Sequence, residues 1–229
     1  MEKPVYKEKL RVRSYQPAGP DDPVFVELKK KYKSVVYKRR LVLPEAQVMK
    51  CFEHGKPLPI HSQIGEEIAY FWDYYETLHP TVFLTYEREA YYALDGSDFR
   101  VTFDENILYR EEDISLGSKI YGTPILGENQ TLMEIKTSGG IPLWMSETLT
   151  KNTLFKTSFS KYGTAYQQMM DDAIEEAQEH GVTVYRDIDK SKFIEAVQPM
   201  HEAFESKGDA YKSLYEDIQK YAVAEEEEK

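Results

Sequence analysis

The chain has 229 residues, of which 41% are hydrophobic and 30% charged, and its formal net charge is −11. This hydrophobic share and the 18 tyrosines exclude a disordered chain, while no apolar run is long enough to span a membrane. The single cysteine, Cys51, excludes an intramolecular disulfide framework and cysteine-rich metal sites. The segment MEKPVYKEKL has no apolar signal core, so we expect a cytoplasmic protein.

The charge is distributed unevenly along the chain. Residues 1–40 contain 12 basic and 5 acidic residues, a local charge of +7. From residue 166 onward there are 7 basic and 17 acidic residues, a charge of −10. A concentrated basic block predicts an anion-binding surface, although a solvated charged face has the same composition.

Three segments near the start have the alternation of half-buried strands. In residues 6–14 the alternation puts four cations on one face: Lys7, Lys9, Arg11 and Arg13. Residues 24–31 put Glu27 and Lys29 on one face, and residues 34–43 do the same with Lys38 and Arg40. Short connections between these strands predict an antiparallel meander.

The later segments predict a mixture of helices and strands. We expect helices at residues 45–55, 62–78 and 141–152, and strands or extended segments at 81–94, 99–109, 119–126 and 130–137. An acidic helical tail follows, with helices expected at 166–181, 190–205 and 208–223. The predicted division is therefore a sheet domain at 1–165 and a helical tail at 166–229.

The charged strand faces allow two interpretations. The later strands add Arg88, Arg100, Glu134 and Lys136 to the cations of the meander. A sheet closed into a barrel would gather these side chains around a wet cationic interior, which requires an anion because unpaired buried charge is strongly unfavourable. Phosphate oxygens match guanidinium and ammonium groups well. An open sheet with its charged face in water is the alternative.

An ordered set of motifs decides between them. The stretches YKEKLRVRSY, VFVELKKKYKSVVYKRR, TYEREAYY, FRVTFD, LMEIK and TSFSKYGTAY resemble the polyphosphate polymerase (VTC, vacuolar transporter chaperone) domain of the CYTH/triphosphate tunnel metalloenzyme superfamily. The resemblance implies an α+β fold, an antiparallel β-barrel or tunnel with flanking helices and, here, an α-helical C-terminal appendage. It also implies that a polyphosphate chain is extended with the terminal phosphate of ATP, aided by Mn²⁺ or Mg²⁺.

The resemblance implies a role for individual residues. Catalytic contacts to phosphate would come from six cations: Arg11, Arg13, Lys29, Lys38, Arg88 and Arg100. Further phosphate contacts would come from Lys9, Tyr86, Lys136, Ser160 and Lys161. Glu134 would bind the metal, although pairing with a neighbouring lysine is the alternative. Tyr86 could instead serve packing alone, and Lys136 could simply balance Glu134.

The two ends of the chain differ from that family. Family members begin with roughly 60 more residues, which carry the opening strands and a lysine near the transferred phosphate, so we expect an incomplete barrel with open strand edges. Such edges could pair between two copies of the chain. The last 55 residues or so, with EEAQEHGVTVY and DKSKFIEAVQPMHEAF, resemble the end of DctP-type TRAP-transporter solute-binding proteins.

Three functions follow from these considerations. The first is a polyphosphate polymerase that uses ATP and polyphosphate. The second is an inorganic triphosphatase of the same fold, and the third is a polyphosphate-binding module without catalysis. Nucleic acid is not an expected partner, because the chain is acidic apart from one basic block.

Overall fold

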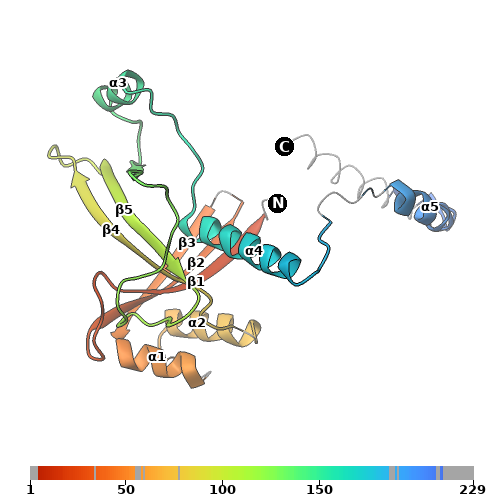
Figure 1. The fold of residues 1–229 in the computed structure, drawn as a ribbon, viewed down its shortest axis with the longest axis horizontal. Helices are drawn as coiled ribbons and strands as arrows, with labels where there is room; N and C mark the ends of the chain where they lie inside the picture. Colours follow the sequence, from red (N-terminus) through yellow and green to blue (C-terminus); the bar gives the residue numbers. More distant parts are fainter. Residues whose placement is uncertain are drawn as a thin grey trace. The chain divides into compact units, whose positions relative to one another are not determined.

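The computed structural model describes residues 5–33, 35–54, 58, 60–76, 78–185, 189, 191–209 and 212–213. It forms two compact units, one of Val5–Ala173 and a second that contains the described residues from Ile174 onward. The elements of the first unit appear in Figure 1. They are β1 (Tyr6–Arg13), β2 (Pro23–Tyr32), β3 (Val35–Pro44), α1 (Glu45–His54), α2 (Gln63–Tyr74), β4 (Phe83–Tyr92), β5 (Arg100–Arg110), β6 (Thr123–Pro124), β7 (Leu132–Lys136), α3 (Leu143–Lys151) and the start of α4 (Lys161–Glu179).

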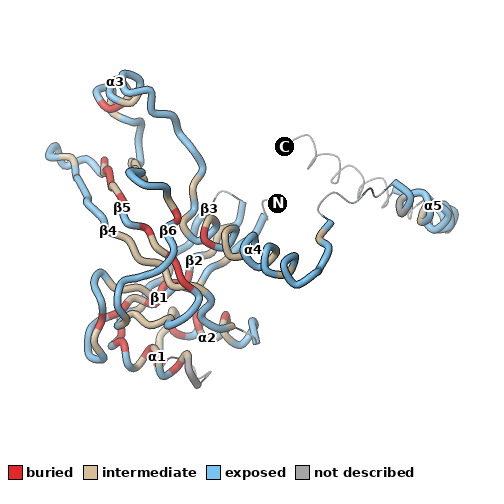
Figure 2. Tube along the Cα trace, in the orientation of Figure 1, coloured by how far each residue is buried: buried red, intermediate tan, exposed pale blue. Residues whose placement is uncertain are grey.

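The first sheet is the antiparallel meander β1-β2-β3, as the alternation predicts. Its register pairs Leu10 with Leu28 and Val12 with Val26, so the apolar positions share one face. Helices α1 and α2 cover this face (Figures 1 and 2). Val24, Val26 and Leu28 are fully buried there against Val48 of α1 and Ile68 and Phe71 of α2.

The helix boundaries follow local signals. Helix α2 begins after Ser62, whose hydroxyl accepts a hydrogen bond from Gly65 N at 3.1 Å and so caps the helix. Helix α4 begins at Lys161, five residues earlier than the sequence predicts, because Ser160 supplies a cap: Gly163 N donates to its hydroxyl at 3.2 Å. The expected extended segment at 119–126 contains only the two-residue strand β6.

The second sheet is built around β5. Strand β4 pairs along one edge of β5, while β6 and β7 pair along the other, all antiparallel. Phe99 and Val101 are buried with Met145 of α3 in one cluster, and Ile107 and Tyr109 are buried with Ala165 of α4 in another. Two helices from different parts of the chain therefore pack on this sheet, α3 on the cluster around Val101 and α4 on the cluster around Tyr109.

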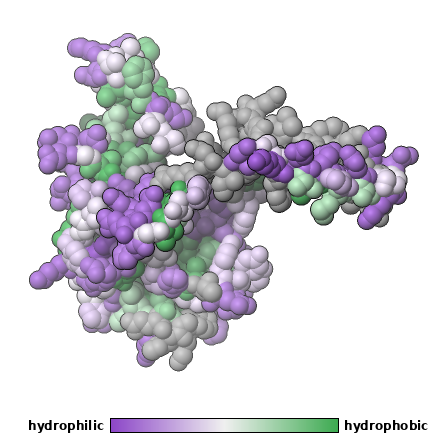
Figure 3. Space-filling model, turned by 45° about the vertical axis from the view of Figure 1, so that its right-hand side comes forward, coloured by the Kyte–Doolittle hydropathy of each residue, from purple (hydrophilic) through white to green (hydrophobic). Residues whose placement is uncertain are grey.

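No strand of the first sheet pairs with a strand of the second among the described residues, so the barrel is not closed. This agrees with the expected α+β fold and its incomplete tunnel. Large apolar side chains are exposed in α3, where Leu143 and Trp144 are 75% and 59% exposed and hydrophobic residues reach the surface (Figure 3). Pairing between two copies through open edges stays a prediction.

The second unit carries helix α5 (Ser191–Glu205), close to the helix expected at residues 190–205. The expected helix at 208–223 lies almost entirely outside the described residues. The predicted division between residues 165 and 166 stays a prediction. No helix within the described parts of the chain is long and apolar enough to cross a membrane.

The placement of the core predicts that substitutions at two positions of the β1-β2-β3 meander will differ in their effect on stability. Leu28→Ala should lower the free energy of unfolding by about 2–5 kcal/mol, because it leaves a cavity under α1 and α2. Val42→Ala, at a residue 52% exposed, should change it by less than about 0.5 kcal/mol. Urea unfolding of both variants tests this, and equal losses would contradict the placement of the core.

Candidate functional site

The face of the first sheet opposite the helices carries a first cluster of charged residues in two cross-strand rows. Residues directly opposite each other in antiparallel strands point to the same side. The register aligns Arg11 with Glu27 and Glu27 with Arg40, which makes one row. It aligns Lys9 with Lys29 and Lys29 with Lys38, which makes the second row. Arg13 lies next to the arginine row.

Glu27 is the centre of the arginine row. It is only 2% exposed, and its two carboxylate oxygens accept from Arg11 Nε at 3.1 Å and from Arg40 Nε at 2.8 Å. Arg13 Nε lies 3.6 Å from the same carboxylate. Burial alone would raise the pKa of Glu27, but the hydrogen bonds and charges of these arginines outweigh it and lower the pKa below its ordinary value. One buried carboxylate thus fixes three guanidinium groups.

The lysine row contains like charges only. Lys9, Lys29 and Lys38 each keep part of their surface in water, and the neighbouring carboxylate is already shared by three arginines. Partial burial, followed by the charges of Lys7, Lys29 and Arg11, lowers the pKa of Lys9. Partial burial and nearby arginines also lower the pKa of Lys38, against the opposing effect of Glu27. The row is therefore a strip of positive charge that favours an anionic ligand.

A second cluster lies on the charged face of the second sheet. It contains six residues from β4, β5, β7 and α4: Arg88, Arg100, Asp104, Glu134, Lys136 and Lys161. Asp104 is fully buried and binds Arg88 in a two-pronged pair, with Nη2 to Oδ2 at 2.7 Å, and it also binds Lys161. Burial raises the pKa of Asp104, but Arg88 and Lys161 outweigh it and lower the pKa.

Tyr86 lies beneath two of these cations. Lys161 Nζ is 4.7 Å and the Arg88 guanidinium 5.1 Å from the centre of its ring. Both distances allow cation–π attraction. Tyr86 also packs against the buried cluster of the second sheet, so it has the packing role, while its contact with phosphate stays a prediction.

Arg100, Lys136 and Glu134 make up the other end of the second cluster. Arg100 is cross-strand to Lys136 and lies over the ring of Tyr92 at 5.7 Å, and its Nε is buried without a hydrogen-bond partner. Glu134 pairs with Lys136 Nζ at 3.0 Å and with Arg88 Nη2 at 3.8 Å. The side chain of Glu134 is 42% exposed, so its carboxylate is accessible to a ligand.

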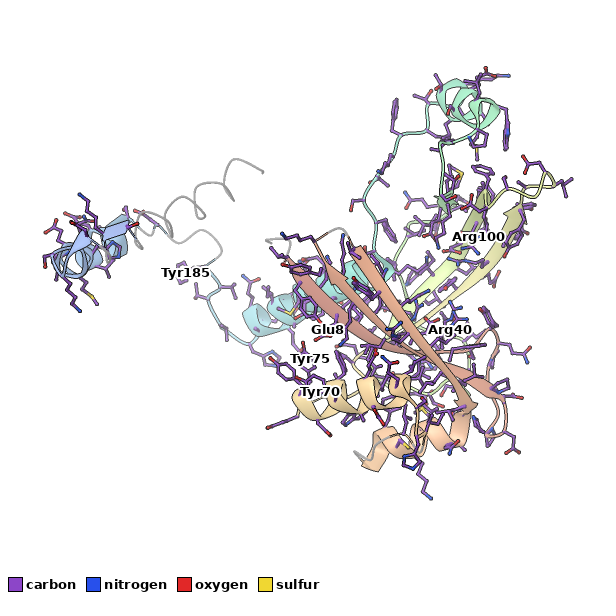
Figure 4. The ribbon with its side chains drawn as sticks, turned by 180° about the vertical axis from the view of Figure 1, so that it is seen from behind. Glu8, Arg40, Tyr70, Tyr75, Arg100 and Tyr185 are labelled. Carbon is purple, nitrogen blue, oxygen red and sulfur yellow. The ribbon has the colours of Figure 1, made fainter. Side chains whose placement is uncertain are left out.

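The start of α4 contacts both clusters. Lys161 binds Asp104 of the second sheet, and the adjacent Tyr162 has Lys9 Nζ of the first sheet 4.6 Å from its ring centre. Ser160 caps the same turn, so the first backbone N–H groups of a 19-residue helix are near these cations. Arg40 and Arg100, labelled in Figure 4, belong to the two different sheets.

A divalent cation fits only if phosphate supplies most of its ligands. Within the described residues, no group of three or more His, Cys, Asp or Glu side chains could hold a metal ion. Asp104 is occupied by two cations, which leaves Glu134 as the accessible carboxylate of the second cluster. Mg²⁺ commonly binds through one or two carboxylates together with substrate phosphates and water. Glu134 is suited to that kind of site.

The sequence did not identify three contributors to the clusters. Glu27 and Arg40 appear in the predicted strand faces without an assigned role, since their pairing depends on strand register. Asp104 lies four residues after Arg100 on the same strand, so the alternation in FRVTFD could have placed it on the charged face. Its burial beneath Arg88 and Lys161 depends on the tertiary structure.

Comparison with known proteins agrees with this description. The family model described as VTC domain matches residues 1–170. No curated protein matches the chain. The match covers well over half of the sequence, and it spans both sheets and the start of α4. The chain therefore belongs to the VTC domain family.

The two buried carboxylates predict a specific acid sensitivity. Because their folded-state pKa values are lowered, the stability they contribute is complete above the ordinary carboxyl pKa of about 4 and is lost as pH falls through the lower folded values. The double variant Glu27→Gln, Asp104→Asn should therefore lose less stability than the wild type between about pH 5 and pH 3. Urea midpoints across this range measure it, and parallel curves would show that these pairs contribute nothing.

Proposed function

We propose that this domain binds inorganic polyphosphate along its two charged clusters and extends it with the terminal phosphate of ATP. The observation that carries the proposal is the lysine row beside the arginine row, an array of cations on one face that has a single buried carboxylate. A linear chain of phosphates has regularly repeated negative charge and is complementary to such an array. Membership of the VTC domain family supports this substrate class.

The second cluster is the better candidate for the phosphoryl transfer. Arg88 and Lys161 are held by the buried Asp104, so they can meet the charge on transferring phosphate oxygens without reorganising. Arg100 and Lys136 add two further cations on the same face. In-line transfer requires positioning and neutralisation of charge more than a general base.

Glu134 is the proposed ligand for Mn²⁺ or Mg²⁺. When bound between phosphates, such an ion neutralises their charge and polarises the phosphorus–oxygen bond that breaks. Lys136 holds the Glu134 carboxylate at 3.0 Å, so it orients this group before a ligand arrives. The remaining ligands would be phosphate oxygens and water.

A polyphosphate-binding module without catalysis is the second candidate. The observation that favours it is the open arrangement of the sheets, which does not enclose the second cluster among the described residues. Water exclusion strengthens the electrostatic interactions on which phosphoryl transfer depends. Binding needs only the cationic faces, which are present.

An assay of product length distinguishes the candidates. Incubation of the protein with ATP and Mn²⁺ or Mg²⁺ should produce polyphosphate longer than any primer, as resolved on gels. Glu134→Gln should remove at least about 90% of the rate, whereas Glu87→Gln, at an exposed position of β4, should leave it unchanged. Release of phosphate from tripolyphosphate without elongation would identify a triphosphatase. Binding without either product would identify the non-catalytic module.

The lysine row predicts that one substitution will stabilise the fold and weaken polyphosphate binding. Lys29→Gln removes the central charge of three aligned lysines, so it should raise the free energy of unfolding by about 0.5 kcal/mol. It should also weaken polyphosphate binding about tenfold, because a charge-assisted hydrogen bond to phosphate is lost.

The matched control for this change is the next residue along the strand. Lys30→Gln alters the opposite face of β2, where Lys30 pairs with Glu8 at 3.6 Å. Its effect on binding should be less than about twofold. Titration with polyphosphate and urea unfolding measure the two effects. Equal losses of affinity in the two variants would show that only overall charge matters.

A further inference from the structure

The two sheets meet through the loop formed by residues 111–121, which follows β5. Leu116 of this loop packs against the core of the first sheet, and its carbonyl accepts a hydrogen bond from Ala18 N at 2.9 Å. Ala18 belongs to the connection between β1 and β2 and is buried. At Gly117, a Cβ atom would come within 2.9 Å of the Ala18 carbonyl oxygen, so the two backbones are in close contact.

Arg110, the last residue of β5, holds this loop in place. Its guanidinium group donates to three carbonyl oxygens: those of Glu112, Asp113 and Tyr121, at 2.9–3.2 Å. The group also packs against two rings, 3.9 Å from the centre of Phe83 and 4.3 Å from that of Tyr121. Phe83 is its cross-strand partner on β4, so the loop is fixed to both strands of the hairpin.

The environment of Arg110 separates it from the cations of the two clusters. It is 5% exposed, whereas the lysines of the first cluster are exposed to water. Its described hydrogen bonds end on backbone carbonyls, and its ion pair is the 4.0 Å contact with Asp113. A guanidinium used in this way orders a loop and is inaccessible to a ligand.

The loop also has internal constraints that make it rigid. Asp113 adopts a positive φ of 46°, and its carboxylate accepts hydrogen bonds from Ser118 Oγ at 2.7 Å and from Tyr121 OH at 3.3 Å. Gly122 follows with a φ of 148° and approaches the backbone of Tyr109 so closely that a Cβ atom would lie 2.4 Å from its carbonyl oxygen. These constraints hold Leu116 and Gly117 in place, so a movement of the first sheet relative to the second has to break their contacts with Ala18.

We propose that Arg110 and residues 111–121 form a clasp that sets the position of the first cluster relative to the second, so that a single polyphosphate chain contacts both. Arg110 is then a positioning residue that never touches the ligand. The inference rests on the proposed function for its consequence, whereas the clasp itself depends only on the contacts described above. Two linked binding surfaces gain affinity for a long ligand only when their geometry allows simultaneous contact.

Chain-length dependence of binding separates positioning from simple stability. Gly117→Ala keeps the net charge and forces the Leu116–Ala18 contact apart, and Arg110→Ala releases the loop. Both should weaken binding of long-chain polyphosphate about tenfold and that of tripolyphosphate, which is short enough for one cluster, less than about twofold. Equal losses for the two ligands, or no loss for the long chain, would overturn the proposal.

Each variant has a matched control. Gly139→Ala adds a methyl group where a Cβ atom meets nothing within 4 Å, so it should bind like the wild type. Arg39→Ala removes one positive charge from the helix-covered face, where Arg39 pairs with Glu67 at 3.0 Å. Any small effect of Arg39→Ala gives the contribution of net charge alone, to be subtracted from the effect of Arg110→Ala.

A measurement without ligand tests the clasp separately from the proposed function. Spin labels at Tyr37→Cys on β3 and Glu89→Cys on β4, in a Cys51→Ser background, report the distance between the sheets. Gly117→Ala should broaden this distance distribution, whereas Gly139→Ala should leave it narrow. An unchanged distribution would overturn the clasp even if the wild type binds polyphosphate. A wild type that binds neither anion would refute the proposed function while the distances still decide on the clasp.

Discussion

Each sheet carries several positive charges on one side, and the structure depends on offsetting the repulsion between them. In the first cluster, six cations (Lys9, Arg11, Arg13, Lys29, Lys38 and Arg40) surround Glu27, which leaves a charge of +5. In the second cluster, four cations and two carboxylates leave +2. Both clusters have a buried carboxylate at the centre, and its attraction to several cations offsets part of their mutual repulsion.

Apolar burial on the opposite face of the first sheet compensates for the repulsion between these cations. In the first sheet, Val24, Val26 and Leu28 are fully buried beneath α1 and α2, and burial of such side chains contributes about 1.5–3 kcal/mol each. The charged face therefore need not contribute to stability. Because residues alternate between faces, each strand of the first sheet carries apolar core residues on one side and charged residues on the other. An anionic ligand that bound the lysine row would reduce the repulsion between its three lysines.

Much of the fold is readable in the sequence because the relevant signals are local. Strict alternation in residues 6–14 identifies β1 and assigns Arg11 to the charged face, and periodic apolar residues identify α2 with Ile68 and Phe71 inward. The sequence predicts the start of α4 five residues too late, because Ser160 and Lys161 follow an irregular segment and the cap depends on the hydrogen bond from Gly163 N to Ser160. Segment 119–126 contains only a two-residue strand, and the loop before it is bound to Arg110 and to Ala18, which is distant in sequence.

The site was less predictable, because alternation assigns a face but gives no register. Lys9, Lys29 and Lys38 form a row only in the register that pairs β1, β2 and β3 as observed, since a shift by two residues would put Lys9 opposite Glu27. Asp104 and Lys161 are 57 residues apart in sequence and meet only because α4 packs against the second sheet. The same packing brings Tyr162 to Lys9, so one turn of helix contacts charged residues of both sheets. Relations of this kind arise from tertiary structure, and they distinguish an ordered charged surface from a strip of cations in water.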